Sequence, residues 1–298
     1  MQIKNLVKKT WYLFKETFRG SMNDNVLQLS AALSYYTIFS LPPLLIIIIS
    51  LSGIFFGADA VRGVIFVQIK GLVGNGAAMQ IQEIIKNVKL SNKNIFATAL
   101  GVSILLIGAS SVFAEIQDSV NYIWGIKAIP KRGLIKFLYN RLMSFSMIGS
   151  VGFLLLVGLI INSIIDILNK RLAIFIPQDA IILLLTVNTL LGFIIITLLF
   201  TFIFKTLPDG KIAYRDCIIG ASFTAFLFMI GKFVISFYLG RYDIASVYGA
   251  AGSIILIFAW VYYSAIILYF GAEFTNVYAQ TYGQKIIPNE YTIQAKNV

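Results

Sequence analysis

Residues 34–57 read SYYTIFSLPPLLIIIISLSGIFFG, and this stretch decides the class of the protein because none of its residues is charged. An uncharged, apolar run of more than about 18 residues is typical of a transmembrane helix. The apolar segment that contains it, residues 26–56, would be about 46 Å long as a straight helix. The hydrocarbon core of a bilayer is only ~30 Å thick. A break inside the segment would therefore fit it into the membrane.

The adjacent prolines at positions 42 and 43 are the predicted break. They have no N–H groups to bond the carbonyls of Ile38 and Phe39, and in hydrocarbon those carbonyls need other partners. Two interpretations stay open: a kinked helix that its neighbours seal, or a broken helix whose backbone lines a cavity, as in many transporters. The candidate broken-helix site comprises Tyr35, Tyr36, Ile38, Phe39, Pro42 and Pro43.

The composition extends this conclusion to the whole chain. Of 298 residues, 58% are hydrophobic and only 12% are charged, whereas a soluble domain has about 25% charged residues. We predict an all-α, polytopic membrane bundle with six transmembrane helices. Their apolar segments are residues 26–56, 95–114 (with a polar extension to Trp124), 142–165, 181–204, 218–239 and 247–272.

The segments outside the membrane also carry patterns. Residues 1–25 place Ile3, Val7, Trp11, Phe14 and Phe18 at helical spacing among lysines, which predicts an amphipathic helix on an anionic membrane surface, with a partner-docking helix as the alternative. The first external loop, 57–94, is predicted to hold two short helices. Residues 26–279 then form the transmembrane domain, and residues 280–298 form a tail.

Lysine and arginine counts predict the orientation. The N-terminus, the second and fourth connections and the tail together carry 15 basic residues, and the other connections carry eight. Because basic residues concentrate in cytoplasmic loops, both termini are expected in the cytoplasm.

Several function classes are excluded. The chain has one cysteine, Cys217, and no histidine, so an internal disulfide, a Cys/His zinc site and a Ser-His-Asp triad are impossible. We expect no catalytic site, no metal and no cofactor. The net charge of +11 is spread over loops, so no nucleic-acid partner is expected. Membrane lipids and an anionic amphiphile are the expected partners.

Charged residues near the membrane are candidates for a substrate or ion pathway, because each costs at least about 2.5 kcal/mol at the bilayer centre. Glu115 and Asp118 share a helical stripe, either as an interfacial extension or as a carboxylate pair lining a cytoplasm-facing cavity. Glu273 ends the sixth segment, and Arg141 is a candidate partner for Glu273 or Asp118, as a clamp or in transport. The pathway candidates are Glu115, Asp118, Arg141, Lys232, Arg241 and Glu273.

Two motifs resemble a known family. The run DNVLQLSAALSYYTIFSLPPLL (24–45) and the run YGAAGSIILIFAWVYYSAIILYFGAEFTNVYA (248–279) resemble the terminal signatures of the YihY/BrkB family of bacterial inner-membrane proteins. The resemblance implies a helical bundle with both ends in the cytoplasm, and a transporter of lipidic or anionic envelope material. Family-typical positions are Tyr35, Tyr36, Pro42, Pro43, Tyr248, Gly249, Trp260, Tyr262 and Glu273.

Our first functional hypothesis is therefore a transporter or flippase-like permease for a lipidic or anionic envelope molecule. An ion-coupled small-solute channel or transporter is the second, and a non-transporting membrane scaffold is the third.

Overall fold

The computed structural model describes residues 2–40, 95–128, 178–241, 250–289 and 292–294, together with Gly63, Met79 and Gln82. Apart from these three residues, the predicted external loop lies outside the described residues, and so do the third segment, Arg141, Pro42 and Pro43. The helices are α1 (Gln2–Asn23), a helix over residues 26–40, α5 (Ile95–Ile123), α7 (Gln178–Thr206), α8 (Tyr214–Arg241) and α10 (Ala250–Thr281). The strands are β1 (Ile126–Ala128), β2 (Gly210–Lys211), β3 (Ile287–Pro288) and β4 (Thr292–Gln294).

The described helices agree with the apolar segments of the sequence. Three of them, α7, α8 and α10, are long and apolar enough to cross a membrane. Each continues past its apolar run, so that α10 ends at Thr281 rather than at residue 272. The membrane helical bundle is therefore confirmed in the described part of the chain, while the number of six spans stays a prediction.

A tight turn joins α1 to the next helix. Asn25 has a positive φ of 52°, a left-handed conformation that asparagine adopts more readily than most residues. The amide of Asp24 donates to the carbonyl of Gly20 at 2.8 Å, and the amide of Gln28 donates to the carbonyl of Asn25 at 2.8 Å. Backbone hydrogen bonds thus complete both the last turn of α1 and the first turn of the following helix.

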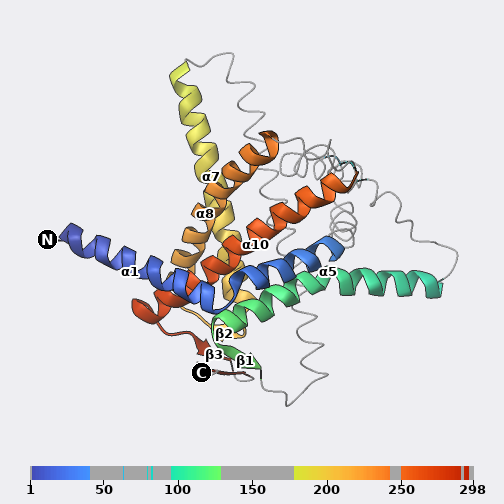
Figure 1. The fold of residues 1–298 in the computed structure, drawn as a ribbon, viewed down its shortest axis with the longest axis horizontal. Helices are drawn as coiled ribbons and strands as arrows, with labels where there is room; N and C mark the ends of the chain where they lie inside the picture. Colours follow the sequence, from blue (N-terminus) through green and yellow to red (C-terminus); the bar gives the residue numbers. More distant parts are fainter. Residues whose placement is uncertain are drawn as a thin grey trace.

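One face of α1 packs against α10, as Figure 1 shows at the N-terminal end of the chain. Leu13, Thr17 and Ser21 are the buried side chains of α1. Among the apolar side chains that suggested an interfacial helix, the described ones are exposed: Trp11 at 69%, Phe14 at 47% and Phe18 at 53%. The helix therefore docks on its own bundle and keeps an aromatic face free, so that binding to the membrane surface stays a prediction.

The contact between α8 and α10 depends on two glycines and two threonines. A Cβ at Gly220 of α8 would collide with the Thr275 side chain of α10, and a Cβ at Gly271 would collide with the Thr224 side chain. Both threonine hydroxyls donate to carbonyls four residues earlier in their own helices, at 2.8 Å and 2.7 Å. Small residues let membrane helices approach closely, because lipid provides no hydrophobic drive for helix association.

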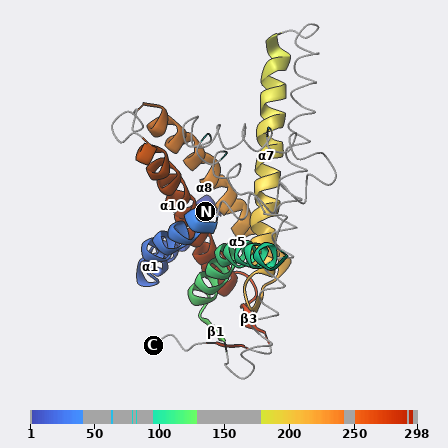
Figure 2. The same ribbon diagram turned by 90° about the vertical axis from the view of Figure 1, so that its right-hand side faces the viewer.

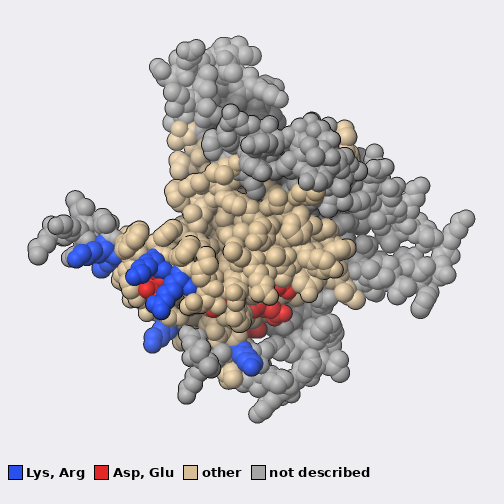
Figure 3. Space-filling view, viewed as in Figure 1, with Lys and Arg blue, Asp and Glu red and all other residues tan. Residues whose placement is uncertain are grey.

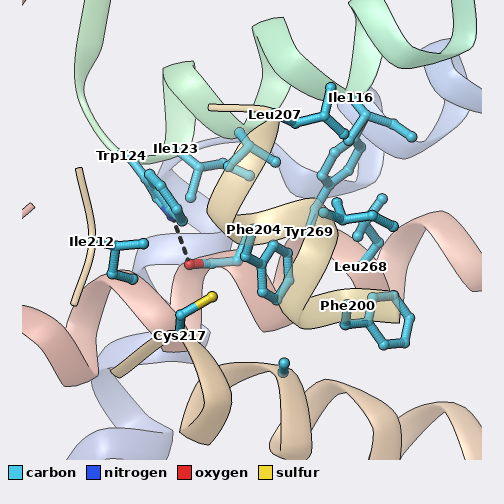
Figure 4. Packing of buried hydrophobic residues seen from close by; sticks show 14 of the residues in the cluster. Ile116, Ile123, Trp124, Phe200, Phe204, Leu207, Ile212, Cys217, Leu268 and Tyr269 are labelled. Carbon is cyan, nitrogen blue, oxygen red and sulfur yellow. Dashed lines mark hydrogen bonds between the residues drawn. The ribbon is translucent and has the colours of Figure 1, made fainter. Parts of the chain in front are cut away.

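A core of buried side chains joins five helices, because it also includes Val26 and Leu33 of the helix over residues 26–40. Figure 4 shows, within this cluster, Ile116 of α5, Trp124 just after α5, Phe204 of α7, Cys217 of α8 and Tyr269 of α10. The helix α8 contacts both α7 and α10 and lies between them (Figure 2). The centre of the described bundle is therefore built from five helices: the helix over residues 26–40, α5, α7, α8 and α10.

Four short strands close one end of the bundle (Figure 1). Strand β1, which follows α5, pairs antiparallel with β4 near the C-terminus, so that Lys127 lies opposite Ile293. Strand β2, between α7 and α8, pairs antiparallel with β3. The sequence analysis predicted an all-α fold and missed these strands, because two or three residues carry no readable period. The predicted tail consequently packs on the bundle through Ile286 and Thr292, which are buried.

The charged side chains gather at the same end of the bundle as the strands. In Figure 3, lysine and arginine side chains lie along α1 and the lower edge, and the upper part of the described surface is uncharged in this view. Lys8, Lys9, Lys15 and Arg19 of α1 are all exposed. The end of the bundle that carries the strands is therefore also the charged end of the described structure.

The Gly–Thr contact makes a stability prediction. Gly220→Ala or Gly271→Ala should lower the free energy of unfolding by about 1–3 kcal/mol, the usual cost of overpacking. Gly192→Ala on α7 is the matched control, because a Cβ there meets nothing within 4 Å, and alanine favours helix by up to ~1 kcal/mol. Unfolding of the purified variants in detergent measures both. Equal stability of the Gly220 and Gly192 variants would contradict the close packing.

Candidate functional site

The carboxyl group of Glu273 is one of two almost fully buried carboxyl groups among the described residues, and the other, on Asp216, accepts a hydrogen bond from the backbone amide of Gln284. Glu273 is 5% exposed on α10. Its Oε1 lies against Gly20 of α1, where any Cβ would collide with the carboxyl group. Its Oε2 is buried, and no N–H or O–H donor of the described residues reaches it. A buried carboxyl oxygen without a donor is costly unless the group carries a proton.

The second carboxyl group of the site belongs to Asp24, in the turn after α1. Asp24 is partly buried and its side chain hydrogen-bonds to Glu273. Burial raises the pKa of Asp24 above its ordinary value, and the hydrogen bond with Glu273 partly offsets this increase. A hydrogen bond between two carboxyl groups requires a proton on one of them. We call Asp24 and Glu273 the acid pair.

Two hydrogen bonds hold the region around Glu273 against the end of α5, and a third lies within α10. The indole Nε1 of Trp124 donates to the carbonyl of Ala272 at 3.0 Å (Figure 4). The side-chain amide of Asn276 donates to the carbonyl of Ile123 at 3.2 Å, and Gln280 donates to Asn276 at 2.8 Å. The residues on either side of Glu273 along α10 are thereby fixed, so the acid pair sits on a rigid support.

The predicted carboxylates Glu115 and Asp118 lie on a different face of α5. Glu115 is partly buried, and Asp118 and Tyr122 are exposed. Burial, and then the neighbouring charge of Asp118, raise the pKa of Glu115, and the hydroxyl of Ser119 lowers it by donating to Oε1 at 3.4 Å. These carboxylates form an outward-facing stripe, one that can contact solvent or lipid headgroups.

The buried stripe of α5 carries amides and surrounds Asp209, in the connection between α7 and α8. Gln117 donates to Oδ1 of Asp209 at 3.3 Å, Asn121 donates to Oδ2 at 3.1 Å, and the Asp209 amide donates back to Asn121 at 2.8 Å. The carbonyl of Asp209 accepts from the amide of Asn289 and the hydroxyl of Thr292. Asp209 therefore joins α5, the α7–α8 connection and the C-terminal segment.

Sequence analysis missed both Asp24 and Asp209. Asp209 lies in the turn LPDG (207–210) and Asp24 in MNDN (22–25), and both would ordinarily be interpreted as turn residues. Their position could have marked them as site residues, because both aspartates lie between two predicted helices, at the end of the bundle where basic residues concentrate.

The described part of the broken-helix site is an intact helix up to Ser40. Tyr35, Tyr36 and Phe39 are exposed, and Ile38 is partly buried. Thr37 donates its hydroxyl to the carbonyl of Leu33 at 2.7 Å. The hydroxyl donor of Thr37 is therefore used within its own helix.

Among the basic candidates, only Lys232 has a side chain within the described residues. Lys232 is exposed on α8, as expected of a side chain that extends toward the membrane surface. Arg241 is the last residue of α8, and its side chain is outside the described set. Whether Arg141 approaches Glu273 or Asp118 remains a prediction.

The comparisons with known proteins follow this geometry. The family profile of virulence factor BrkB matches residues 17–292. The chain belongs to the BrkB family. Its relatives include a UPF0761 membrane protein of Psychromonas ingrahamii, 24% identical over 92% of this chain and 89% of the relative. A UPF0761 membrane protein of Vibrio vulnificus is 28% identical over 85% of this chain and 78% of the relative. No solved structure matches.

The family match contains every part of the candidate site. Residues 17–292 include Asp24, Glu273, Asp209 and Trp124. The relatives are membrane proteins by name, in agreement with the three described helices of this BrkB-family chain that are long and apolar enough to cross a membrane. The family membership that the two terminal motifs indicated is confirmed.

The indole bond of this BrkB-family protein can be tested by a conservative change. Trp124→Phe should lower the free energy of unfolding by roughly 1–3 kcal/mol, because the buried carbonyl of Ala272 loses its side-chain donor and packing volume is lost. Trp11→Phe is the matched control, since Trp11 is 69% exposed. Thermal unfolding in detergent should place Trp11→Phe near the wild type, and equal losses in both variants would contradict the structure.

The Asp209 network can be tested by a double-mutant cycle. Asn121→Ala and Asp209→Ala should show a coupling free energy of about 0.5–3 kcal/mol, as residues within one hydrogen-bond network do. A cycle between Asp209→Ala and Thr224→Ala is the control, because Thr224 donates within α8. The free energies of unfolding of the wild type and of all single and double variants give the coupling free energy of each cycle. Additivity in the first cycle would contradict the network.

Proposed function

We propose that this protein is a transporter or flippase-like permease of the bacterial cytoplasmic membrane, carrying a lipidic or anionic envelope molecule. The observation that supports the proposal is the division of helix 26–40 into a hydroxyl face and an aromatic face. A pathway for an amphiphile needs both a polar surface for its headgroup and an apolar surface for its chains, side by side.

The hydroxyl face lies inside the bundle. Ser30, Ser34 and Ser40 are almost completely buried, and Ser40 shares a hydrogen bond of 2.6 Å with Ser111 of α5. Polar side chains within membrane helices either join helices or line pathways. The hydroxyl groups of Ser30 and Ser34 are bonded to carbonyls of their own helix, so their oxygens retain capacity to accept hydrogen bonds from a polar headgroup.

The aromatic face lies outside. Tyr35 packs on Phe39 with ring centroids 4.8 Å apart and on Tyr36 at 5.9 Å. Exposed tyrosines combine an apolar ring with a hydroxyl group that suits the edge of a bilayer. An acyl chain could lie along this face while its headgroup follows the hydroxyl face, a separation that a small-solute channel would not require.

The orientation of the proposed transporter follows from charge. The exposed lysines of α1 and the strands formed by the C-terminal segment lie at one end of the bundle. Because basic residues favour the cytoplasmic side, this end is assigned to the cytoplasm and both termini with it.

Reconstituted protein tests the function. Vesicles containing the purified protein should move a fluorescent anionic phospholipid analogue between leaflets faster than protein-free vesicles. Ser34→Val should slow this movement at least several-fold, because it replaces a buried hydroxyl with apolar bulk on the hydroxyl face. Ser264→Val is the matched control: Ser264 is partly buried on α10 and donates to its own helix at 2.8 Å.

Other outcomes would identify the alternatives. Ion conductance in planar bilayers without lipid movement would favour a channel. A stoichiometric envelope protein that co-purifies, combined with no flux of lipid or anion, would favour a scaffold. Either result contradicts the lipid pathway.

A further inference from the structure

The acid pair places two carboxyl groups in contact inside an apolar bundle. Glu273 is 95% buried, given its exposure of 5%, and its Oε2 accepts from no N–H or O–H donor of the described residues. Asp24 acts on Glu273 through its charge and through a side-chain hydrogen bond, and Glu273 acts on Asp24 through that same hydrogen bond. The side-chain amide of Asn276 is a further hydrogen-bond donor to the Glu273 carboxyl group. A site with two carboxyl groups and no described cation beside them favours one bound proton.

We infer that Asp24 and Glu273 hold one proton between them, and that this proton keeps α1 seated on α10. The proton forms the hydrogen bond between the two carboxyl groups. When it leaves to solvent, two like charges face each other at short range in a partly buried site, where Coulomb repulsion is stronger than in water. Asp24 belongs to the turn that ends α1 and Glu273 belongs to α10, so the repulsion acts between these two elements.

Gly20 makes the docking of α1 sensitive to the state of Glu273. The Cα of Gly20 lies directly against the Glu273 carboxyl group, in a space that would not admit a methyl group. A carboxylate that gains charge recruits water, and on the Gly20 side of the Glu273 carboxyl group there is no room for water unless α1 moves away. Thr17 and Ser21 on the same face of α1 are buried, so a movement of α1 would expose polar side chains at low cost.

A metal ion fits this place less well than a proton. The described residues contain no group of three or more histidine, cysteine, aspartate or glutamate side chains that could hold a metal ion. A bound cation would also have to separate two carboxyl groups that hydrogen-bond to each other. Sodium is therefore an outcome of the test rather than part of the inference.

The other titratable groups near the site are on α5. Glu115 and Asp118 act electrostatically on Tyr269 of α10, one helical turn before Glu273. Burial raises the pKa of Glu115 too, so Glu115 adds a pH dependence of the same sign. This contribution is common to the wild type and to all variants of the acid pair, and the comparison between variants removes it.

The sign of the effect follows from linkage. A carboxyl group whose folded-state pKa is raised stabilises the fold fully below its unfolded pKa, and the stabilisation is lost as pH rises through the folded pKa. For one proton the loss in the ratio of folded to unfolded protein is at most about tenfold per pH unit. Full-length protein in lipid nanodiscs should therefore unfold at lower temperature as pH rises above the ordinary carboxyl range.

The decisive variants change carboxyl groups to amides. Glu273→Gln supplies an N–H donor in place of the proton, so its unfolding temperature should stay near the low-pH value of the wild type and depend less on pH. Asp24→Asn should likewise reduce the pH dependence, and it serves as the test if Glu273→Gln fails to fold. Glu16→Gln on α1 is the matched control and should retain the wild-type dependence.

A spectroscopic measurement shows whether Glu273 carries a proton or only contributes to packing. Infrared spectra of the wild type at neutral pH should contain a protonated-carboxyl band that is absent from Glu273→Gln. An unchanged pH dependence in both amide variants, or the absence of that band, overturns the inference. Sodium-specific stabilisation of the wild type at high pH, lost in Glu273→Gln, would also overturn it and assign the site to sodium. None of these measurements depends on transport.

Discussion

The close approach of α8 and α10 is the contact on which the rest of the described structure depends. It exists because Gly220 and Gly271 have no side chains, and each accommodates a threonine of the opposite helix. In a bilayer, two apolar helices gain little from each other's apolar surface, so van der Waals contact between near-bare backbones has to hold them together. The threonine hydroxyls satisfy themselves within their own helices, and the contact is therefore free of unpaired polar groups.

This contact also fixes the rotation of α10 about its axis. Thr275 faces α8, and Glu273, two residues earlier and therefore about 200° around the helix, faces α1. Ala272 and Asn276 meet the end of α5. A single helix thus presents a small-residue face to α8, a carboxyl group to α1 and hydrogen-bonding groups to α5. The acid pair is a consequence of this arrangement, since no other rotation would bury Glu273 beside Asp24.

The sequence predicted the features that depend on long runs of apolar residues. Runs of apolar residues are long enough to locate helices without tertiary information, so the segments that became α5, α7, α8 and α10 could be identified. Glu273 could be singled out because a charge at the end of an apolar run is conspicuous. The terminal motifs supported the family, which the match over residues 17–292 confirms.

What the sequence did not predict depends on contacts between distant residues. Asp24 and Glu273 are far apart in the chain, and only the docking of α1 on α10 brings them together. The same holds for Asp209, whose partners come from α5 and from the C-terminal segment. On α5, the two polar stripes are one residue apart in register, and helical spacing cannot tell which faces the core. Packing buries Gln117 and Asn121 and leaves Asp118 exposed.

The central claim is that α10 has one rotation in the bundle, which puts Thr275 against Gly220 and Glu273 against Asp24. An experimental structure of the full-length protein in a lipid nanodisc, at a resolution that shows side chains, tests it most directly. The account predicts the Glu273 carboxyl group in contact with both Asp24 and Gly20, with Thr275 seated on Gly220. A structure in which α10 is rotated so that Glu273 faces lipid, or pairs with a lysine or arginine, would contradict it.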